Sequence, residues 1–156
     1  MHITIVAVGQ KLPAWAQTAV DDYLARFPRD FTVIVKEVKA EARTGGKPVA
    51  QVMAAEAERI ERAIPAGDIL VAMDEHGRDM NTVDFSKKIS GWKNEGCGVT
   101  FIIGGADGLD PALKAKSRMM LRLSSMTLPH AFARVLLTEQ IYRAWSILAN
   151  HPYHRV

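Results

Sequence analysis

The last six residues, "HPYHRV", place two imidazoles, one phenol and one guanidinium within positions 151–156. These groups exchange protons, donate hydrogen bonds and stabilise anions, which are the tasks of an acid–base or anion-stabilising site. Chain ends are usually frayed and polar without having a function. The segment is therefore either a chance polar end or a tail that folds over a reaction site. In both cases we expect the residues from Tyr153 to Val156 to add little to the core.

A second candidate is the glycine-rich segment "FIIGGADGLD", residues 101–110, in which a strand-like run leads into Gly104 and Gly105. Glycine permits positive φ and lets the backbone approach a ligand closely. The G-x-G-x-x-G spacing of dinucleotide sites is absent, and no Gly-Lys-Ser/Thr follows as in a phosphate-binding P-loop. The segment is then either a ligand-binding turn of another kind or an ordinary tight turn.

A third candidate is "LSSMTLPHAF", residues 123–132, where a small polar loop precedes Pro129. Such a loop offers unpaired backbone N–H and C=O groups, which suit recognition of the edge of an adenine. The alternative is a helix cap, in which the Thr127 hydroxyl satisfies the first helical turn.

The long helical pattern of residues 129–150 has a polar face and a wide apolar surface. The polar face holds Glu139, Arg143, Ser146 and Asn150. Arg143 either pairs with Glu139 at i, i+4 or points into a site at the sheet edge. The apolar surface predicts burial in the core or against a partner chain, and we expect a dimer contact around Leu137, Ile141 and Trp145.

Several other kinds of site are not supported. Cys97 is the only cysteine, so neither an intrachain disulfide nor a cysteine-rich zinc site is possible. The histidines lack H-E-x-x-H spacing, and no G-x-S-x-G elbow supports a serine nucleophile. We therefore expect no metal site.

The composition is typical of a globular protein, with 48% hydrophobic and 24% charged residues among 156. No run approaches the ~18 apolar residues of a membrane span, and the first residues do not resemble a signal peptide. With one cysteine, these features predict a cytoplasmic protein without a membrane partner. The net charge of +3 is compatible with a phosphate-rich partner but does not require one.

Strand-like and helix-like patterns alternate along the chain. The predicted strands are 2–8, 31–38, 68–73, 98–103 and 119–124, and the predicted helices are 13–27, 48–64, 81–93 and 129–150. This alternation predicts an α/β fold, a parallel sheet covered by helices on both faces, in a single domain spanning residues 1–156. In such folds, ligands bind at the carboxyl ends of the strands.

Taken together, "AVGQKLPAW", "YLARFP", "FIIGGADGL", "LSSMTLPHAFARVLLTEQIYRAWSI" and "NHPYHR" resemble segments of the large-subunit ribosomal RNA methyltransferase H family. This family belongs to the SPOUT superfamily of knotted methyltransferases. The resemblance spans the whole chain and is most specific in the C-terminal third. It implies a SPOUT-type α/β domain whose C-terminal chain threads a trefoil knot, a feature that general topology rules do not predict.

The resemblance also implies that S-adenosylmethionine is the methyl donor and is bound by the loops of the knot. The implied cofactor-binding residues are Met73, Gly104, Gly105, Leu123, Ser124, Ser125, Met126, Thr127, Leu128 and Pro129. The family commonly has leucine where this chain has Met73, and methionine preserves an apolar contact to adenine.

The implied substrate is a pseudouridine in a stem-loop of 23S rRNA, methylated at N3. The N3 proton must be lost before the nitrogen attacks the methyl group, and a cation near the flanking carbonyls stabilises the anion. The implied catalytic residues are Arg143, Tyr153, His154 and Arg155. The sequence does not decide which of them removes the proton.

The implied partners are a second copy of the chain, in a homodimer, and the ribosome. Candidate RNA contacts are Lys36, Lys39, Arg43, Lys47, Lys114, Lys116, Arg118 and Arg122, although each of them is also compatible with a merely solvated face. Two alternatives remain: a SPOUT enzyme acting on another RNA such as tRNA, and a non-catalytic flavodoxin-like module.

Overall fold

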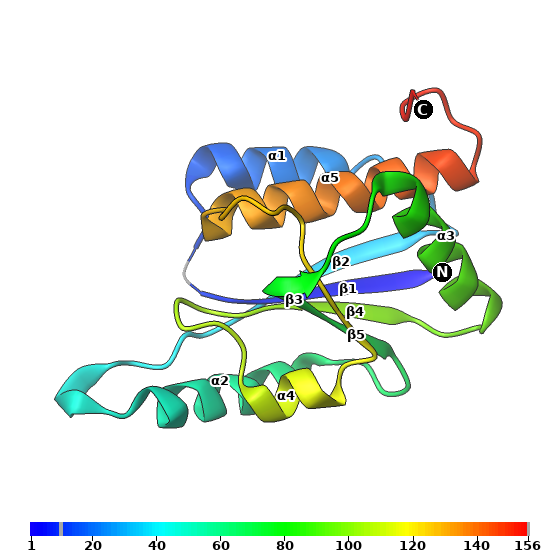
Figure 1. Ribbon diagram of the computed structural model, residues 1–156. Helices are drawn as coiled ribbons and strands as arrows, with labels where there is room; N and C mark the ends of the chain where they lie inside the picture. The colour runs from blue at the N-terminus through cyan, green and yellow to red at the C-terminus, as the bar shows by residue number, and fades with distance from the viewer. Residues whose placement is uncertain (10, 156) are drawn as a thin grey trace.

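The computed structural model describes residues 1–9 and 11–155 (Figure 1). In chain order the elements are β1 (His2–Val8), α1 (Ala14–Leu24), β2 (Thr32–Val38), a 3₁₀ turn η1 (Thr44–Gly46), α2 (Val49–Ala63), β3 (Ile69–Arg78), α3 (Thr82–Asn94), β4 (Val99–Ile103), α4 (Pro111–Lys116), β5 (Met119–Leu121) and α5 (His130–Leu148). Gln10 of the "AVGQKLPAW" segment and Val156 of the tail lie outside this description.

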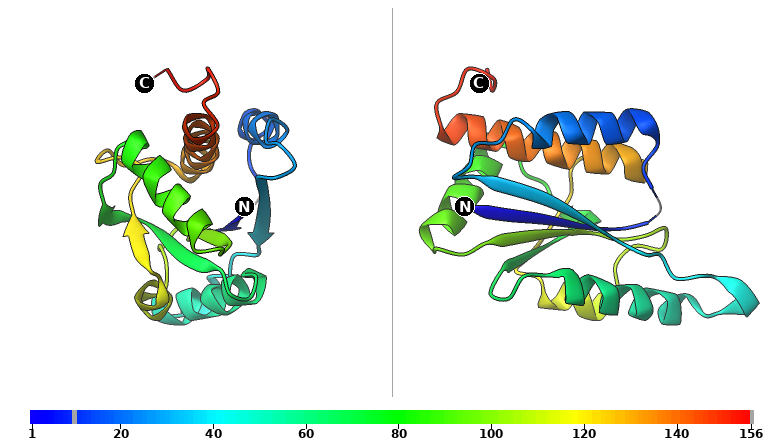
Figure 2. Two further views of the ribbon diagram at one scale, coloured as in Figure 1. Left: turned by 90° about the vertical axis from the view of Figure 1, so that its right-hand side faces the viewer. Right: turned by 180° about the vertical axis from the view of Figure 1, so that it is seen from behind.

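The five strands form one parallel sheet in the order β2-β1-β4-β3-β5. Helices α1, α3 and α5 cover one face, and α2 and α4 cover the other (Figure 2). The predicted α/β fold with a covered parallel sheet is confirmed. The trefoil knot of the C-terminal chain stays a prediction.

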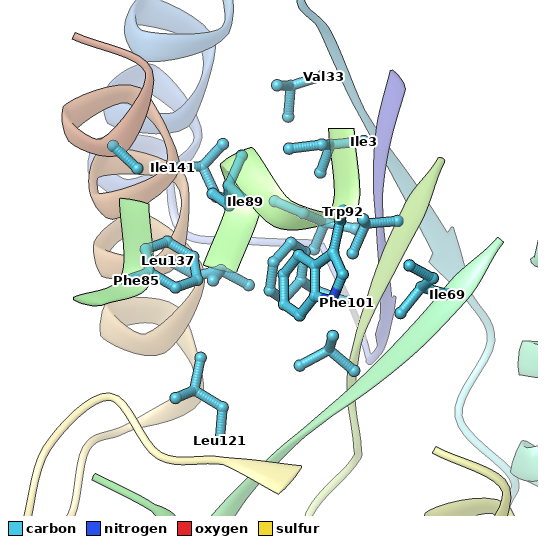
Figure 3. Packing of buried hydrophobic residues seen from close by; sticks show 14 of the residues in the cluster. Ile3, Val33, Ile69, Phe85, Ile89, Trp92, Phe101, Leu121, Leu137 and Ile141 are labelled. Carbon is cyan, nitrogen blue, oxygen red and sulfur yellow. The ribbon is translucent and has the colours of Figure 1, made fainter. Parts of the chain in front are cut away.

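The alternation of side chains along β1 explains the two layers. Ile3 and Ile5 pack in a cluster with residues of α3 and α5, whereas Val6 and Val8 pack against α2 and α4. The first cluster is the larger and includes Phe101 on β4 (Figure 3). Both faces of the sheet are therefore apolar, as expected for parallel strands that helices cover on both sides.

The main differences from the sequence-based prediction are two strand ends and one additional helix. Strand β3 extends to Arg78, with a register shift between Met73 and Arg78, and β5 ends at Leu121 rather than at residue 124. Helix α4 was not predicted. It starts after Asp110, whose side chain accepts hydrogen bonds from two backbone N–H groups of the first turn.

The strand register brings the candidate cofactor segments together. Met73 on β3 pairs with Ile103 on β4 on one side and with Leu121 on β5 on the other. The segments that follow these three positions therefore leave the sheet at the same edge. Helix α5 begins at this edge and runs to the opposite end of the molecule, where the C-terminal tail lies (Figure 1).

Within the described residues, no helix has the length and apolar character needed to cross a membrane.

Candidate functional site

The carboxyl ends of the strands surround a large cavity of about 900 Å³. It is lined by the ends of β1, β3 and β4, by the turn 104–109, by α2 and by the start of α5. This volume lies within the range of small-molecule and cofactor sites. A ligand of cofactor size therefore has room at the edge that the topology predicts.

A smaller cavity of about 140 Å³ adjoins the large one and is lined mainly by the segment 121–128. The two cavities share Met73, Ile103 and Leu128 as lining residues. All of the predicted cofactor-binding residues except Ser125 and Pro129 line one cavity or the other. The structure thus brings most of these predicted residues, from three separate segments, to one place.

The turn after β4 requires glycine because backbone segments meet there. A Cβ atom on Gly104 would lie 2.6 Å from the carbonyl carbon of Gly108, a distance that no side chain tolerates without displacing the turn. The turn is closed by the Gly108 N–H, which donates to the Gly105 carbonyl over 3.0 Å. Gly104 is thus needed for the turn itself, independently of any ligand.

Gly105 faces α2 rather than open space. A Cβ atom there would lie 3.1 Å from Glu56 Oε1 and 3.2 Å from Val8 Cγ1. Glu56 is only 3% exposed and lines the cavity. Its Oε2 accepts a hydrogen bond from the Glu41 backbone N–H at 3.0 Å, and its Oε1 has no partner among the described residues. A buried carboxylate oxygen at this place favours a ligand with hydroxyl or cationic groups.

The predicted catalytic residues gather at the other end of α5. Tyr153 donates its hydroxyl proton to Glu139 Oε1 at 3.0 Å, and its oxygen lies 2.9 Å from the Tyr23 hydroxyl. Arg143 Nε donates to the same Glu139 oxygen at 2.8 Å, and Arg143 Nη1 donates to the His154 carbonyl at 3.0 Å. The Arg143 guanidinium also lies 4.8 Å from the centre of the Tyr153 ring.

These contacts fix the protonation states of two groups. Burial raises the pKa of the Tyr153 phenol, and hydrogen bonds with Tyr23 and Glu139 raise it further. The hydrogen bond with Glu139 raises the pKa of the Arg143 guanidinium. Tyr153 is therefore a neutral donor and Arg143 a cation at physiological pH.

The expectation that the tail adds little to the core is wrong for Tyr153. Its ring packs edge-on against Tyr142 with centroids 4.8 Å apart, and Tyr142 stacks on Trp145 at 5.3 Å. The chain turns back toward this cluster after α5, with positive φ at Asn150 and Arg155. Only the residues beyond Tyr153 remain as candidates for a tail without a packing role, and Val156 is not described.

A single chain does not bring the two halves of the predicted site together. His130 lines the large cavity at the start of α5, and Arg143 lies 13 residues further along the same helix. At the rise of an α-helix this separation is about 20 Å. The cofactor segments and the tail residues therefore lie at opposite ends of α5.

Sequence reasoning missed the roles of Glu56, Tyr23 and Glu139. Glu56 falls in line with Val52 and Ile60 at helical spacing, so a glutamate on the apolar face of α2 was a detectable signal. Glu139 was recognised only as a pairing partner of Arg143. Tyr23 had no signal, because its contact with the tail spans 130 positions of sequence.

The predicted dimer contact needs correction. Leu137 and Ile141 are fully buried in the core of the single chain, and Trp145 packs against the same core. The exposed apolar residues at the start of α5 and on α1 are instead Phe132 and Trp15, about half exposed, with ring centroids 4.9 Å apart.

Most of the candidate RNA-binding cations already have partners. The ion pairs are Arg43–Asp107, Lys47–Glu41, Lys114–Asp74, Lys116–Glu61, Arg118–Glu95 and Arg122–Asp79, and Lys36 donates to the Ala63 carbonyl. To bind RNA, each of these cations would have to release its present carboxylate or carbonyl partner and pair with a phosphate instead. Among the described part of the chain, no group of three or more His, Cys, Asp or Glu side chains is placed to hold a metal ion.

The chain matches a family model described as "Predicted SPOUT methyltransferase" over residues 1–154. The chain is also similar to relatives that bear the name Ribosomal RNA large subunit methyltransferase H. The one from Ralstonia pickettii is 53% identical over 156 residues, with 100% of each chain covered, and the one from Bordetella avium is 54% identical over 155 residues, with 99% of each covered.

Solved structures show the same fold. A probable methylase family protein from Haemophilus influenzae superposes with a TM-score of 0.58 at 13% identity, covering 96% of this chain and 67% of that chain. A putative methylase family protein from Neisseria gonorrhoeae gives a TM-score of 0.54 at 14% identity, covering 96% and 93%.

Proposed function

Because the chain belongs to the SPOUT methyltransferase family, we propose that residues 1–156 form one S-adenosylmethionine-dependent domain that methylates N3 of a pseudouridine in 23S ribosomal RNA. The observation that supports this most strongly is the pair of adjoining cavities lined by Met73, the turn at Gly104–Gly105 and the segment 123–128. The name of the relatives, which specifies large-subunit ribosomal RNA, supports the substrate class.

The lining of the cavities fits S-adenosylmethionine. Met73, Ile103 and Leu128 offer apolar contacts for an adenine, and the loop backbones offer hydrogen-bonding groups. The buried carboxylate of Glu56, with one unpaired oxygen in the cavity wall, can accept hydrogen bonds from the hydroxyl or ammonium groups that such a cofactor carries. The cofactor supplies an activated methyl group, so the protein has to contribute position, proton removal and electrostatic stabilisation.

The tail and Arg143 offer the groups that a pseudouridine needs. The Arg143 and Arg155 guanidinium groups are cations suited to stabilising the anion that forms when N3 loses its proton. Tyr153 stays protonated, and its hydroxyl can donate to a uracil-like base when it exchanges Glu139 for that base. Among the four residues, only the imidazole of His154 is an ordinary proton acceptor, and we assign it the role of general base.

A homodimer would bring these groups to the cofactor. Methyl transfer requires the reacting atoms to approach within about 3–3.5 Å, whereas Arg143 and the start of α5 are about 20 Å apart in one protomer. The tail of one protomer would then complete the site at the strand ends of its partner. Trp15 and Phe132, which are exposed beside that site, are the apolar residues best placed for the contact.

Phe132→Asp should therefore shift the protein from dimer to monomer and reduce methyl transfer. In the dimer, the introduced carboxylate would lose its hydration without gaining a partner. Burial of an unpaired charge costs several kcal/mol, so the dimer should be strongly destabilised. Sedimentation velocity at micromolar concentration would measure the change. Val49→Asp is the matched control, because Val49 is about as exposed as Phe132 but lies on α2, which covers the opposite face of the sheet. A monomeric wild-type protein with full activity would overturn the proposed dimer.

Transfer of labelled methyl groups from S-adenosylmethionine tests the proposed substrate. Unmodified ribosomes and free tRNA should be offered separately, and the labelled nucleotide should then be mapped. We expect label on a 23S rRNA pseudouridine and none on tRNA. Label on tRNA alone would show that tRNA, and not ribosomal RNA, is the substrate. No label on either RNA would contradict the proposed activity. If the substrate is ribosomal, the protein acts in the cytoplasm.

A further inference from the structure

A groove of about 520 Å³ runs along α3 and shares no lining residue with the two cofactor cavities. Helix α3 contributes Asp84, Lys87, Lys88, Gly91 and Glu95, whose spacing of three and four residues puts them on one face of the helix. At the rise of an α-helix this face is about 16 Å long. The proposed chemistry does not use this groove, although its length suits an extended ligand.

Three cations of the groove have no carboxylate partner. Arg78 at the end of β3 and Lys87 and Lys88 on α3 are exposed, and none of the three forms an ion pair with another described residue. They differ in this from most of the candidate RNA contacts that the sequence suggested, which hold a carboxylate. A free cation can bind a phosphate without first releasing a partner.

The carboxylates of the groove are mostly neutralised. Arg122 donates to both oxygens of Asp79 at 2.7 and 2.8 Å, and Arg118 donates to both oxygens of Glu95 at 2.9 Å. Asp84 is the one carboxylate of the lining that has no ion pair among the described residues. An anion in the groove therefore meets three free cations and one free carboxylate, and the groove favours a polyanion.

The groove leads to the cofactor site. A cavity of about 280 Å³ lies between them, because it shares Met80 with the groove and Leu121, Arg122 and Leu123 with the smaller cofactor cavity. The groove lies next to β5, at one edge of the sheet, whereas α1 with Trp15 lies toward the opposite side (Figure 2). The proposed dimer contact on α1 thus leaves the groove accessible.

We propose that the groove along α3 binds the sugar–phosphate backbone of the ribosomal RNA beside the target nucleotide, with Arg78, Lys87 and Lys88 in contact with phosphates. This inference rests on the proposed function, because it names the surface by which the same enzyme holds the same RNA. Phosphate contacts supply affinity and fix the orientation of a nucleic acid without reading its sequence. The groove would therefore direct the RNA toward the methyl donor.

Two variants change the charge of the groove in opposite directions. Lys87→Ala/Lys88→Ala removes two free cations, and Asp84→Asn removes the free carboxylate with little change of shape. Arg62→Ala/Lys93→Ala is the matched control, because it removes the same charge from two exposed side chains on α2 and α3 that do not line the groove.

Cosedimentation with unmodified ribosomes over a range of KCl concentrations should distinguish these variants. We expect the double lysine variant to bind about tenfold more weakly at low salt, and the slope of log affinity against log salt to decrease by about two, one for each phosphate contact. Asp84→Asn should bind more tightly than wild type, a gain that misfolding cannot produce. The control should stay close to wild type.

Calorimetry should give the wild-type affinity for S-adenosylmethionine in every variant, since the groove and the cofactor cavities have no residue in common. A double lysine variant that matches the wild type or the control in affinity and salt slope would overturn the inference alone. If that variant does not fold, Asp84→Asn decides, and unchanged or weaker ribosome binding would contradict the inference. A wild-type protein that binds ribosomes but transfers no methyl group would overturn the proposed function, whereas the binding measurements would still test the groove.

Discussion

A chain that ends after Tyr153 should fold normally and transfer methyl groups about 10²–10³ times more slowly, the effect of losing one charge-stabilising contact. The truncation removes the His154 imidazole and the Arg155 guanidinium, the proposed base and one proposed cation. It retains the Tyr153 ring, which packs against Tyr142 and hydrogen-bonds with Glu139. Single-turnover methylation of unmodified ribosomes at saturating S-adenosylmethionine would measure the rate.

Two controls separate a catalytic loss from a structural one. The truncated protein should match the full-length protein in melting temperature and in sedimentation coefficient. Arg62→Ala removes an exposed guanidinium from α2, where it forms an ion pair with Glu58 on the same helix, and should leave the rate unchanged. A truncated protein that reaches the full-length rate would show that the last residues are only a frayed end.

Gly105→Val should weaken S-adenosylmethionine binding by about 5- to 150-fold, which corresponds to ~1–3 kcal/mol of overpacking. The added Cβ would lie 3.1 Å from Glu56 Oε1 and 3.2 Å from Val8 Cγ1, so either the turn or these two side chains must move, and both line the cavity. Calorimetry with the purified variant would measure the affinity.

The matched control is Gly91→Val, because a Cβ atom on Gly91 of α3 meets no atom within 4 Å. Circular dichroism and thermal melting should show that both variants are folded. Unchanged affinity in a folded Gly105→Val protein would place the cofactor elsewhere than beside this turn.

The strands of the sheet and the candidate site segments at its edge could be predicted from the sequence. The β-branched runs and helical periodicities locate all five strands, and parallel strands must end at a common edge, where Met73 and Gly104 meet. Helix α4 was missed because six residues are too few to establish a periodicity, although Asp110-Pro111 is a recognisable helix start.

The sequence could not show which apolar residues of α5 face the core. Leu137 and Ile141 face the sheet and α3, whereas Phe132 stays exposed, and all three have similar hydrophobicity. Sequence also could not place the tail. Tyr153 meets Tyr23 of α1, and such long-range contacts between polar aromatic residues leave no periodic signal along the chain.

The cofactor turn of one protomer and the tail of another should act together, since α5 holds them about 20 Å apart within a chain. A heterodimer tests this most directly. One protomer should lack the residues after Tyr153, the other should have Gly105→Val, and two different affinity tags allow the mixed dimer to be purified. The assay is single-turnover methylation of unmodified ribosomes at an S-adenosylmethionine concentration below the wild-type dissociation constant. Each homodimer should be slow there, the truncated one because it lacks the proposed base and the Gly105→Val one because it binds the cofactor about 5- to 150-fold more weakly. The heterodimer should recover about half of the wild-type rate, because one of its two symmetry-related sites is intact. A heterodimer as inactive as the two homodimers would contradict the account, because the turn and the tail would then have to come from the same chain.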